Sequence, residues 1–253
     1  MKAVLRCEIP CKDRAVRGAL CLPQAGCPVV LFCHGFGGSG ADFEKAAARL
    51  AEGGIGSLRI DFCGGSNRAQ QYLSTEQMTL GTQQEDLHAA IDYLLAQGVS
   101  PRKLFLFGGS QGGLAAALAA AQRPQEVRGL ILLYPALCIP DDWNARFPSE
   151  EDIPARHTLW GVTLGKEYFV YARKLDVFSS IGKYTGPVLI MHGDADKVVP
   201  VEYSRRAART YPQARLIEFA GEGHGFSPRA DRTCTAYTEE FVEQCLRTPP
   251  DRS

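Results

Sequence analysis

Residues 103–113, KLFLFGGSQGG, decide the fold of this 253-residue chain. An apolar run ends in two glycines, Ser110 follows, and two more glycines come after Gln111. Residues 114–121 then form an alanine-rich run. This order predicts a buried strand, a tight turn and a helix packed closely against the strand. The pentapeptide at 108–112 fits G-x-S-x-G, the turn that raises a nucleophilic serine above a sheet.

Ser110 is expected at the tip of this turn, in a strained backbone conformation of the kind that collects at functional sites. Small neighbours let the strand and the helix approach each other. The free N–H groups at the start of the helix favour a developing negative charge. The pattern therefore predicts Ser110 as a nucleophile. The alternative is a glycine-rich turn in which the serine only caps the helix.

Strand and helix patterns alternate along most of the chain. Short, continuous apolar runs are typical of strands that are covered on both faces. Besides the run before Ser110, strands are expected at residues 3–9, 14–22, 28–33, 55–62, 127–134, 187–191 and 214–219. Helices are expected at residues 41–52, 82–97, 114–121, 202–211 and 235–246. The alternation predicts an α/β fold, with a mainly parallel eight-stranded sheet and helices on both faces.

The alternation breaks between residues 136 and 179. This segment holds both tryptophans and the charged run at 149–152, and it is too long for an ordinary connection. We therefore expect a core formed by residues 1–135 and 180–253, with a small cap or lid inserted at 136–179 over the strand ends. A surface excursion without a catalytic part is the alternative.

Composition and charge exclude several classes of function. The 28 Lys and Arg residues balance 28 Asp and Glu residues, which gives no electrostatic case for binding nucleic acid or an anionic membrane. Residues 1–8 lack the apolar core of a signal peptide, and no apolar run reaches the roughly 20 residues of a membrane span. The nine cysteines are expected as reduced core thiols, so we expect a cytoplasmic protein.

A serine hydroxyl is a weak nucleophile, and it needs a base together with a group that orients the base. In this architecture the chain order is serine, acid, histidine. His224 is the histidine that follows both Ser110 and an acid at a strand end, so it is the predicted base. His192 precedes the candidate acids, and we expect it to pack or hydrogen-bond at its own strand end.

The acid is less well determined by the pattern of residues. Asp194 and Asp196 both follow the strand expected at 187–191, and Asp176, before that strand, is a weaker third candidate. The pattern of residues does not distinguish between Asp194 and Asp196. Any of the three could instead make a local turn with its own backbone.

Two N–H donors are needed to hold the negative oxygen of a tetrahedral intermediate. One is expected from Gln111, directly after the nucleophile. The other is expected from the turn HGFGG at residues 34–38, whose glycines let the main chain approach a substrate. A phosphate cradle is the alternative, but the turn lacks the features of a P-loop and the spacing G-x-G-x-x-G. No metal-ligand spacing is present, so neither a metal nor a cofactor is expected.

Together these segments resemble the α/β-hydrolase superfamily over nearly the whole chain, and within it the chain is similar to the bacterial cinnamoyl and feruloyl esterases. The matching segments are HGFGG at 34–38, GGSQGG at 108–113, HGDADKVVP at 192–200 and GHGF at 223–226. The resemblance implies an α/β-hydrolase fold. It also implies Asp196 as the acid, and the N–H groups of Phe36 and Gln111 as the oxyanion hole.

The insertion is similar to the small cap of this family, above all in GVTLG at 161–165 followed by Tyr168. The resemblance implies that Asp142, or Asp141 in its place, and Tyr168 bind the aromatic hydroxyl of a cinnamoyl group. Two segments depart from the family pattern. Gly109 stands where a histidine usually precedes the nucleophile, and CGGS at 63–66 replaces a G-H-G segment.

The sequence thus predicts a serine carboxylesterase that hydrolyses small acyl or hydroxycinnamoyl esters through an acyl-enzyme. The same machinery also suits peptides, aminoacyl amides or acyl thioesters, because the mechanism is shared. A third alternative is a hydrolase scaffold without activity. The expected partner is a small-molecule ester, with no nucleic acid and no membrane, and a homodimer is left open.

Overall fold

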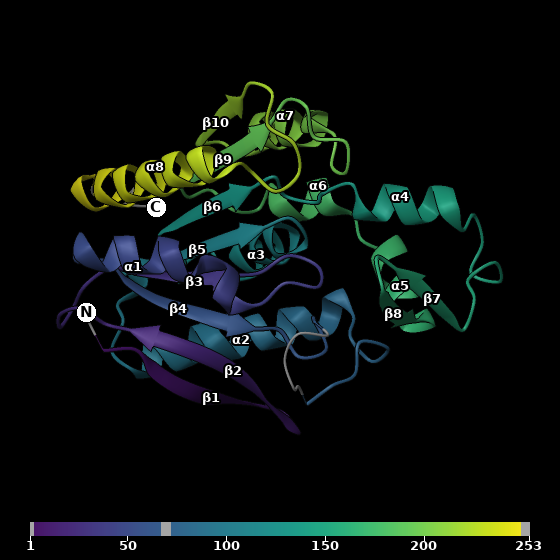
Figure 1. Ribbon diagram of the computed structural model, residues 1–253, viewed down its shortest axis with the longest axis horizontal. Coiled ribbons are helices and arrows are strands. Elements are labelled where there is room, and N and C mark those ends of the chain that lie inside the picture. Colours follow the sequence, from purple (N-terminus) through teal and green to yellow (C-terminus); the bar gives the residue numbers. More distant parts are fainter. Residues whose placement is uncertain (1–2, 67–71, 249–253) are drawn as a thin grey trace.

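The computed structural model describes residues 3–66 and 72–248, which form an eight-stranded sheet with helices on both faces (Figure 1). In spatial order the strands are β1 (Leu5–Cys11), β2 (Arg14–Cys21), β4 (Gly56–Asp61), β3 (Val29–Cys33), β5 (Leu104–Gly109), β6 (Gly129–Leu133), β9 (Val188–Gly193) and β10 (Ala214–Phe219). β2 is antiparallel to both of its neighbours, β1 and β4. The other neighbours pair in parallel. The predicted α/β fold with a mainly parallel sheet is confirmed.

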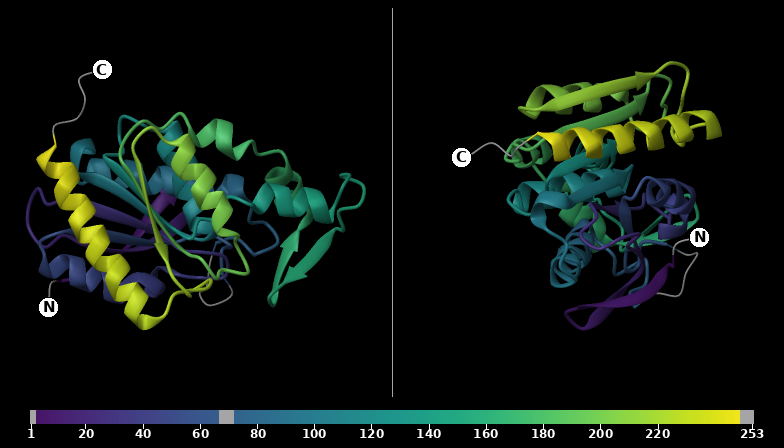
Figure 2. Two further views of the ribbon diagram at one scale, coloured as in Figure 1. Left: turned by 90° about the horizontal axis from the view of Figure 1, so that it is seen from above. Right: turned by 90° about the vertical axis from the view of Figure 1, so that its left-hand side faces the viewer.

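The helices form two layers (Figure 2). One face of the sheet carries α1 (Glu44–Glu52) and α8 (Pro228–Arg247), and the other carries α2 (Leu80–Ala96), α3 (Gln111–Gln122), α6 (Val177–Ile181) and α7 (Val201–Thr210). Two short 3₁₀ helices, η1 (Gly40–Phe43) and η2 (Pro101–Lys103), precede α1 and β5.

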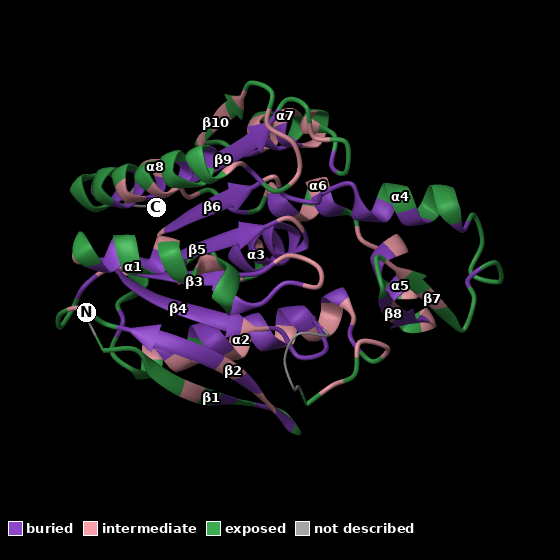
Figure 3. Ribbon diagram, viewed as in Figure 1, coloured by how far each residue is buried: buried purple, intermediate pink, exposed green. Residues whose placement is uncertain are grey.

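The central strands are buried along their whole length (Figure 3). Successive side chains of a strand point to opposite faces, so each strand contributes to two apolar clusters. Leu31 and Leu106 belong to the cluster under α2 and α3. Phe32 and Phe107 belong to the cluster under α1 and α8. This two-sided burial explains the continuous apolar runs in the sequence.

The last helix starts at Pro228, and the prediction that it starts at residue 235 was wrong. Ser227 caps the helix, because its hydroxyl oxygen accepts the Ala230 N–H at 3.3 Å. Pro228 occupies the first turn, where a backbone N–H would have no acceptor in any case. This capped turn precedes the amphipathic spacing on which the prediction rested.

Residues 136–179 contain α4 (Ile139–Arg146), a hairpin of β7 (Arg156–Leu159) and β8 (Val162–Gly165), α5 (Lys166–Arg173) and the start of α6. In Figure 1, α4, α5 and the hairpin extend beyond the carboxyl ends of the parallel strands. α5 contacts both α4 and α2. The expected boundary at residue 179 falls inside α6. The division into a core and an inserted cap stays a prediction.

The nine cysteines are free thiols, and all except the half-buried Cys7 are buried. In the described part of the chain, no helix is long and apolar enough to cross a membrane. Nor do three or more His, Cys, Asp or Glu side chains of residues 3–66 and 72–248 gather in a way that could hold a metal ion.

Candidate active site

A tight turn between β5 and α3 carries Ser110 at the carboxyl edge of the sheet. Ser110 has φ of 52° and ψ of −122°, a strained conformation for a residue with a side chain. A Cβ on Gly112 would overlap the carbonyl oxygens of Cys33 and His34, and one on Gly108 would overlap the backbone of Gly112. Only glycine fits at these positions, so the turn is fixed against the end of β3 and presents the serine hydroxyl.

His224 lies in the loop after β10 and reaches the serine. Its Nε2 is 3.0 Å from Ser110 Oγ, and its Nδ1 is 2.8 Å from Asp196 Oδ2. Gly225 has φ of 80°, so the turn that follows the histidine favours glycine. The ring of Tyr134 packs on the imidazole, with 4.7 Å between the ring centroids. Loops after β5, β9 and β10 thus bring serine, histidine and aspartate, here called the triad, into one hydrogen-bonded chain.

The side chain of Asp196 is fully buried and surrounded by donors. Its Oδ1 accepts the N–H groups of Val198 at 2.8 Å and Val199 at 2.9 Å, while its Oδ2 faces His224. Burial alone would raise the pKa of Asp196, but these hydrogen bonds outweigh burial and hold the pKa below its usual range. An ionised carboxylate here keeps a proton on His224 Nδ1, which leaves Nε2 free to accept one.

The other two candidate acids form local hydrogen bonds. Asp194 Oδ1 accepts the Gly221 N–H at 2.7 Å. Asp176 caps α6 by accepting the Ser179 N–H at 3.2 Å. Of the three acids, Asp196 is the one that the structure places beside the imidazole.

A second histidine, which sequence reasoning left outside the site, also contacts the carboxylate of Asp196. His192 is fully buried, and its Nε2 lies 3.2 Å from Asp196 Oδ2 and 3.0 Å from the carbonyl oxygen of Val199. Both partners are acceptors, so Nε2 carries the proton. Nδ1 then accepts the hydroxyl of Ser204 at 2.6 Å. Burial lowers the pKa of His192 and keeps it neutral. The spacing H-x-x-x-D at 192–196 was the sequence feature that could have indicated this contact between His192 and Asp196.

The turn after β3 lies directly against the nucleophile. A Cβ on Gly35 would lie 3.1 Å from Ser110 Cβ. His34 Nε2 accepts the Phe62 N–H at 3.0 Å, so its Nδ1 carries the proton and donates to Gly35 O at 2.7 Å. The C=O and N–H of a trans peptide point in opposite directions. His34 therefore directs the N–H of Phe36 away from its own ring.

Gln111 is the first residue of α3, so its N–H has no acceptor within that helix. Its side chain is held on both sides. The Oε1 atom accepts the hydroxyl of Tyr168 at 2.7 Å, and Nε2 donates to Gln83 Oε1 at 3.0 Å. Tyr168 is only 2% exposed. Its hydroxyl proton is thus directed at Gln111, and the three side chains link α5 to α3 and α2.

A largely apolar cavity of about 310 Å³ opens beside Ser110. Trp143 and Trp160 form part of its wall, and Lys197 is among its polar groups. Asp141 is turned elsewhere, because its Oδ2 accepts the hydroxyl of Tyr203 at 2.7 Å. The predicted site residues that line the cavity are Phe36, Ser110, Gln111, Asp142 and Tyr168.

The segment CGGS at 63–66 supports the turn after β3. Ser66 Oγ donates to Gly37 O at 3.2 Å, and the Gly37 N–H donates to Gly65 O at 3.1 Å. Cys63 does not line the cavity beside Ser110. It is 2% exposed, and burial raises the pKa of its thiol to about 12. This segment therefore holds the turn in place, and its thiol is not an activated nucleophile.

The sheet, the serine turn and the triad together define an α/β-hydrolase. The model of the prolyl oligopeptidase family matches residues 41–248, a range that includes all three triad residues. The chain belongs to this family.

Solved structures give a matching result. Est1E from Butyrivibrio proteoclasticus, in a structure with ferulic acid bound, is 28% identical to this chain. The match has a TM-score of 0.84 and covers 96% of this chain and 100% of that chain. The esterase EaEST from Exiguobacterium antarcticum is 19% identical, with a TM-score of 0.74 over 94% and 100%, which shows the shared fold. The protein is accordingly a serine hydrolase of the esterase-like class.

Proposed function

We propose that the protein is a carboxylesterase that hydrolyses small acyl or hydroxycinnamoyl esters through an acyl-enzyme. The observation that carries the proposal is the hydrogen-bonded chain from Ser110 through His224 to Asp196 at the edge of an apolar cavity. The hydroxycinnamoyl class is supported by the likeness to Est1E, which binds ferulic acid.

In the first half of the reaction, Ser110 Oγ attacks the ester carbonyl carbon while His224 Nε2 takes the hydroxyl proton. Asp196 stays ionised and stabilises the imidazolium that forms. The carbonyl oxygen becomes negative, and we assign the N–H groups of Phe36 and Gln111 as its donors. His224 then gives its proton to the alcohol oxygen as the carbon–oxygen bond breaks, and the acyl group remains on Ser110.

In the second half, His224 Nε2 removes a proton from a water molecule as the water oxygen attacks the acyl carbon. His224 then returns this proton to Ser110 Oγ as the bond between Ser110 and the acyl group breaks and the acid leaves. The acyl group would occupy the cavity of about 310 Å³, whose aromatic and aliphatic wall suits a flat ring. Asp142 lines that cavity, and its carboxylate is the acceptor we assign to a ring hydroxyl of the acyl group. Tyr168 would act on the substrate indirectly, through Gln111.

Replacing Ser110 with Ala tests the proposal. The variant lacks the nucleophile, so kcat for p-nitrophenyl acetate is expected to fall by about 10⁴-fold or more. Circular dichroism should show an unchanged fold. Ser149→Ala, a change at an exposed serine that bonds to Asp152, is the matched control and should keep full activity. Turnover by Ser110→Ala at the wild-type rate would refute the proposal.

The substrate class requires a separate measurement, since esters, amides and thioesters share the mechanism. Values of kcat/KM for methyl ferulate, an aminoacyl p-nitroanilide and an acyl thioester should be compared on the same preparation. We expect methyl ferulate to be the best of the three. A higher value for the anilide would assign the protein to the peptidases of its family instead.

A further inference from the structure

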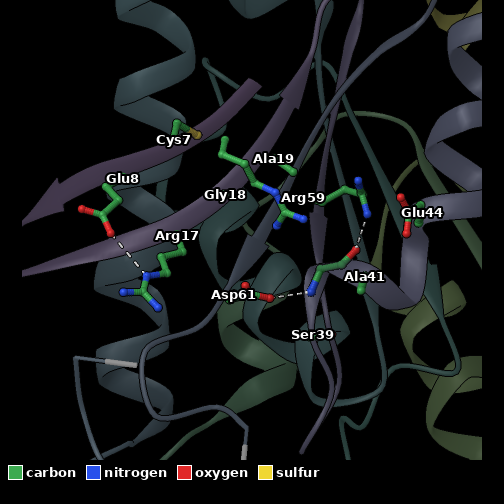
Figure 4. Close-up of a pocket in the computed structure, with 12 residues that line it drawn as sticks. Cys7, Glu8, Arg17, Gly18, Ala19, Ser39, Ala41, Glu44, Arg59 and Asp61 are labelled. Carbon is green, nitrogen blue, oxygen red and sulfur yellow. Dashed lines mark hydrogen bonds and ion pairs between the residues drawn. The ribbon is translucent and has the colours of Figure 1, made fainter. Parts of the chain in front are cut away.

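A second cavity lies on the α1 face of the sheet, where β1, β2, β4 and η1 meet (Figure 4). It has a volume of about 460 Å³ and shares no lining residue with the cavity beside Ser110. Leu58 and Ile60 of β4 belong to the core under α2 and α3. Because side chains alternate along a strand, Arg59 and Asp61 face the other side and line this cavity.

Arg59 is the buried cation of the second cavity, with 8% of the residue exposed. Its Nη1 donates to Gly40 O at 3.1 Å. Within residues 3–66 and 72–248, Nε and Nη2 have no hydrogen-bond acceptor, and no carboxylate lies within ion-pair distance of this guanidinium. A guanidinium carries five N–H donors in a planar fork, and a buried charge without a partner is costly. The unused donors therefore favour a ligand with oxygen acceptors.

The sheet register places a second arginine in line with the first. Arg6 of β1 pairs with Ala19 of β2, and Ala19 pairs with Arg59 of β4. Directly opposite residues of antiparallel strands share a face of the sheet. Arg6 is exposed, and the described part of the chain offers it neither a hydrogen bond nor an ion pair. Arg6 and Arg59 thus flank the small residue Ala19 in the strand register, and all three line the cavity.

The carboxylates that line the same cavity are engaged elsewhere or lie at a helix start. Glu8 Oε1 accepts Arg17 Nε at 3.3 Å, and Asp61 Oδ1 accepts the Gly40 N–H at 2.7 Å (Figure 4). Glu44 begins α1, where the helix dipole favours a negative charge. The row of Glu8, Arg17 and Asp61 thus holds two carboxylates and one arginine, whereas the row of Arg6, Ala19 and Arg59 holds two arginines and no carboxylate.

We propose that this cavity binds a small oxyanion, a carboxylate or a phosphate, over Ala19 between Arg6 and Arg59. Both anions present pairs of oxygen atoms that match the planar fork of a guanidinium. Gly40, which Arg59 and Asp61 hold, follows the turn that carries Phe36. The proposed site thus shares a wall with the turn beside the nucleophile, although the anion would not touch the triad.

Isothermal titration calorimetry of the full chain tests this site, with inorganic phosphate in one series and acetate in another, at constant ionic strength. Saturable one-site binding is expected for at least one of them, and the tighter anion identifies the ligand class. Arg6→Gln should weaken this binding by about tenfold, because one charged hydrogen-bond donor is lost. Arg59→Lys keeps the charge but loses the fork, and a similar loss is expected.

Arg102→Gln is the matched control, because Arg102 is an exposed arginine on η2, before the amino end of β5. The affinity of the Arg102→Gln variant for either anion should equal that of the wild type. The proposal is overturned if neither anion binds saturably to the wild type, or if Arg6→Gln binds as tightly as the wild type. Equal weakening by Arg102→Gln would also overturn it, since the response would then follow net charge. Arg6 is exposed, so the test does not depend on whether Arg59→Lys folds.

Discussion

Asp196 and Asp194 belong to the same loop, and their surroundings separate them. Asp196 receives N–H groups from Val198 and Val199 and faces the rings of His192 and His224. The sequence left both aspartates open, because the choice depends on which carboxylate the loop backbone turns inward. The family resemblance implied Asp196, and the physical reason is visible only once the loop is folded.

Replacing Asp196 with Asn is expected to lower kcat by about 10⁴-fold, because an amide favours the wrong tautomer of the imidazole. Asp194→Asn is the matched control. Its side-chain oxygen can still accept the Gly221 N–H, so activity should stay near that of the wild type. Steady-state kinetics with p-nitrophenyl acetate measures both variants. The assignment fails if Asp194→Asn is the more damaging change.

Tyr168, on α5, connects the segment at 136–179 to the start of α3. Its hydroxyl donates to Gln111, whose backbone N–H we assign to the oxyanion. The family resemblance implied instead that this hydroxyl binds the substrate. The two roles predict different results, because only a direct contact with substrate depends on a ring hydroxyl of the acyl group.

Tyr168→Phe is expected to lower kcat/KM for methyl ferulate and for methyl cinnamate by the same factor, about fivefold to tenfold, from the loss of one buried hydrogen bond. Tyr171→Phe, on the same helix and 39% exposed, should change neither value. Methyl cinnamate lacks the ring hydroxyl. A loss confined to methyl ferulate would show that Tyr168 contacts the substrate directly.

At the scale of elements, apolar runs predicted the buried strands of the sheet, because burial on both faces leaves few polar positions. The hairpin of β7 and β8 was not predicted. It turns at Trp160 and Gly161, with φ of 48° and 79°. Two-residue hairpin turns with positive φ at both central positions usually carry Asn or Gly at the first of them. A tryptophan at that position gives no turn signal in the sequence.

At the scale of the whole molecule, three residues far apart in the sequence meet at one edge of the sheet. The carboxyl ends of parallel strands share an edge, so the strand order β5, β6, β9, β10 brings Ser110, Asp196 and His224 together. Strand and helix alternation therefore predicted the shared edge, while the order of serine, acid and histidine along the chain and the family resemblance supplied the three residues. The substrate, the partners and the core–cap division stay predictions, because they depend on cavity chemistry and on domain behaviour that alternation does not encode.

The free energy of unfolding should depend on pH because His192 is buried and neutral in the folded protein. Burial lowers the pKa of His192 in the folded state, while the unfolded residue titrates near a pKa of about 6.5. As the pH falls through this value, the unfolded chain takes up a proton that the folded protein does not. The free energy of unfolding therefore decreases, and its full contribution is present only above this pH.

Urea unfolding between about pH 7.5 and 5.5 measures this effect in the wild type and in His192→Gln. The glutamine keeps an N–H donor near Asp196 but does not titrate, so its pH dependence should be shallower. His157, whose pKa burial also lowers, is present in both proteins and cancels in the comparison. Equal pH dependence in the two proteins would contradict the neutral, buried state assigned to His192.

Labelling with a fluorophosphonate probe tests the triad most directly, because the probe reacts with a serine only when a neighbouring base activates it. Intact-mass and peptide-mapping mass spectrometry should find one label per chain, on Ser110. The label should be absent in Ser110→Ala. Labelling of His224→Ala should be much slower than labelling of the wild type. A stoichiometric label on another residue, or none on the folded wild-type protein, would contradict the account.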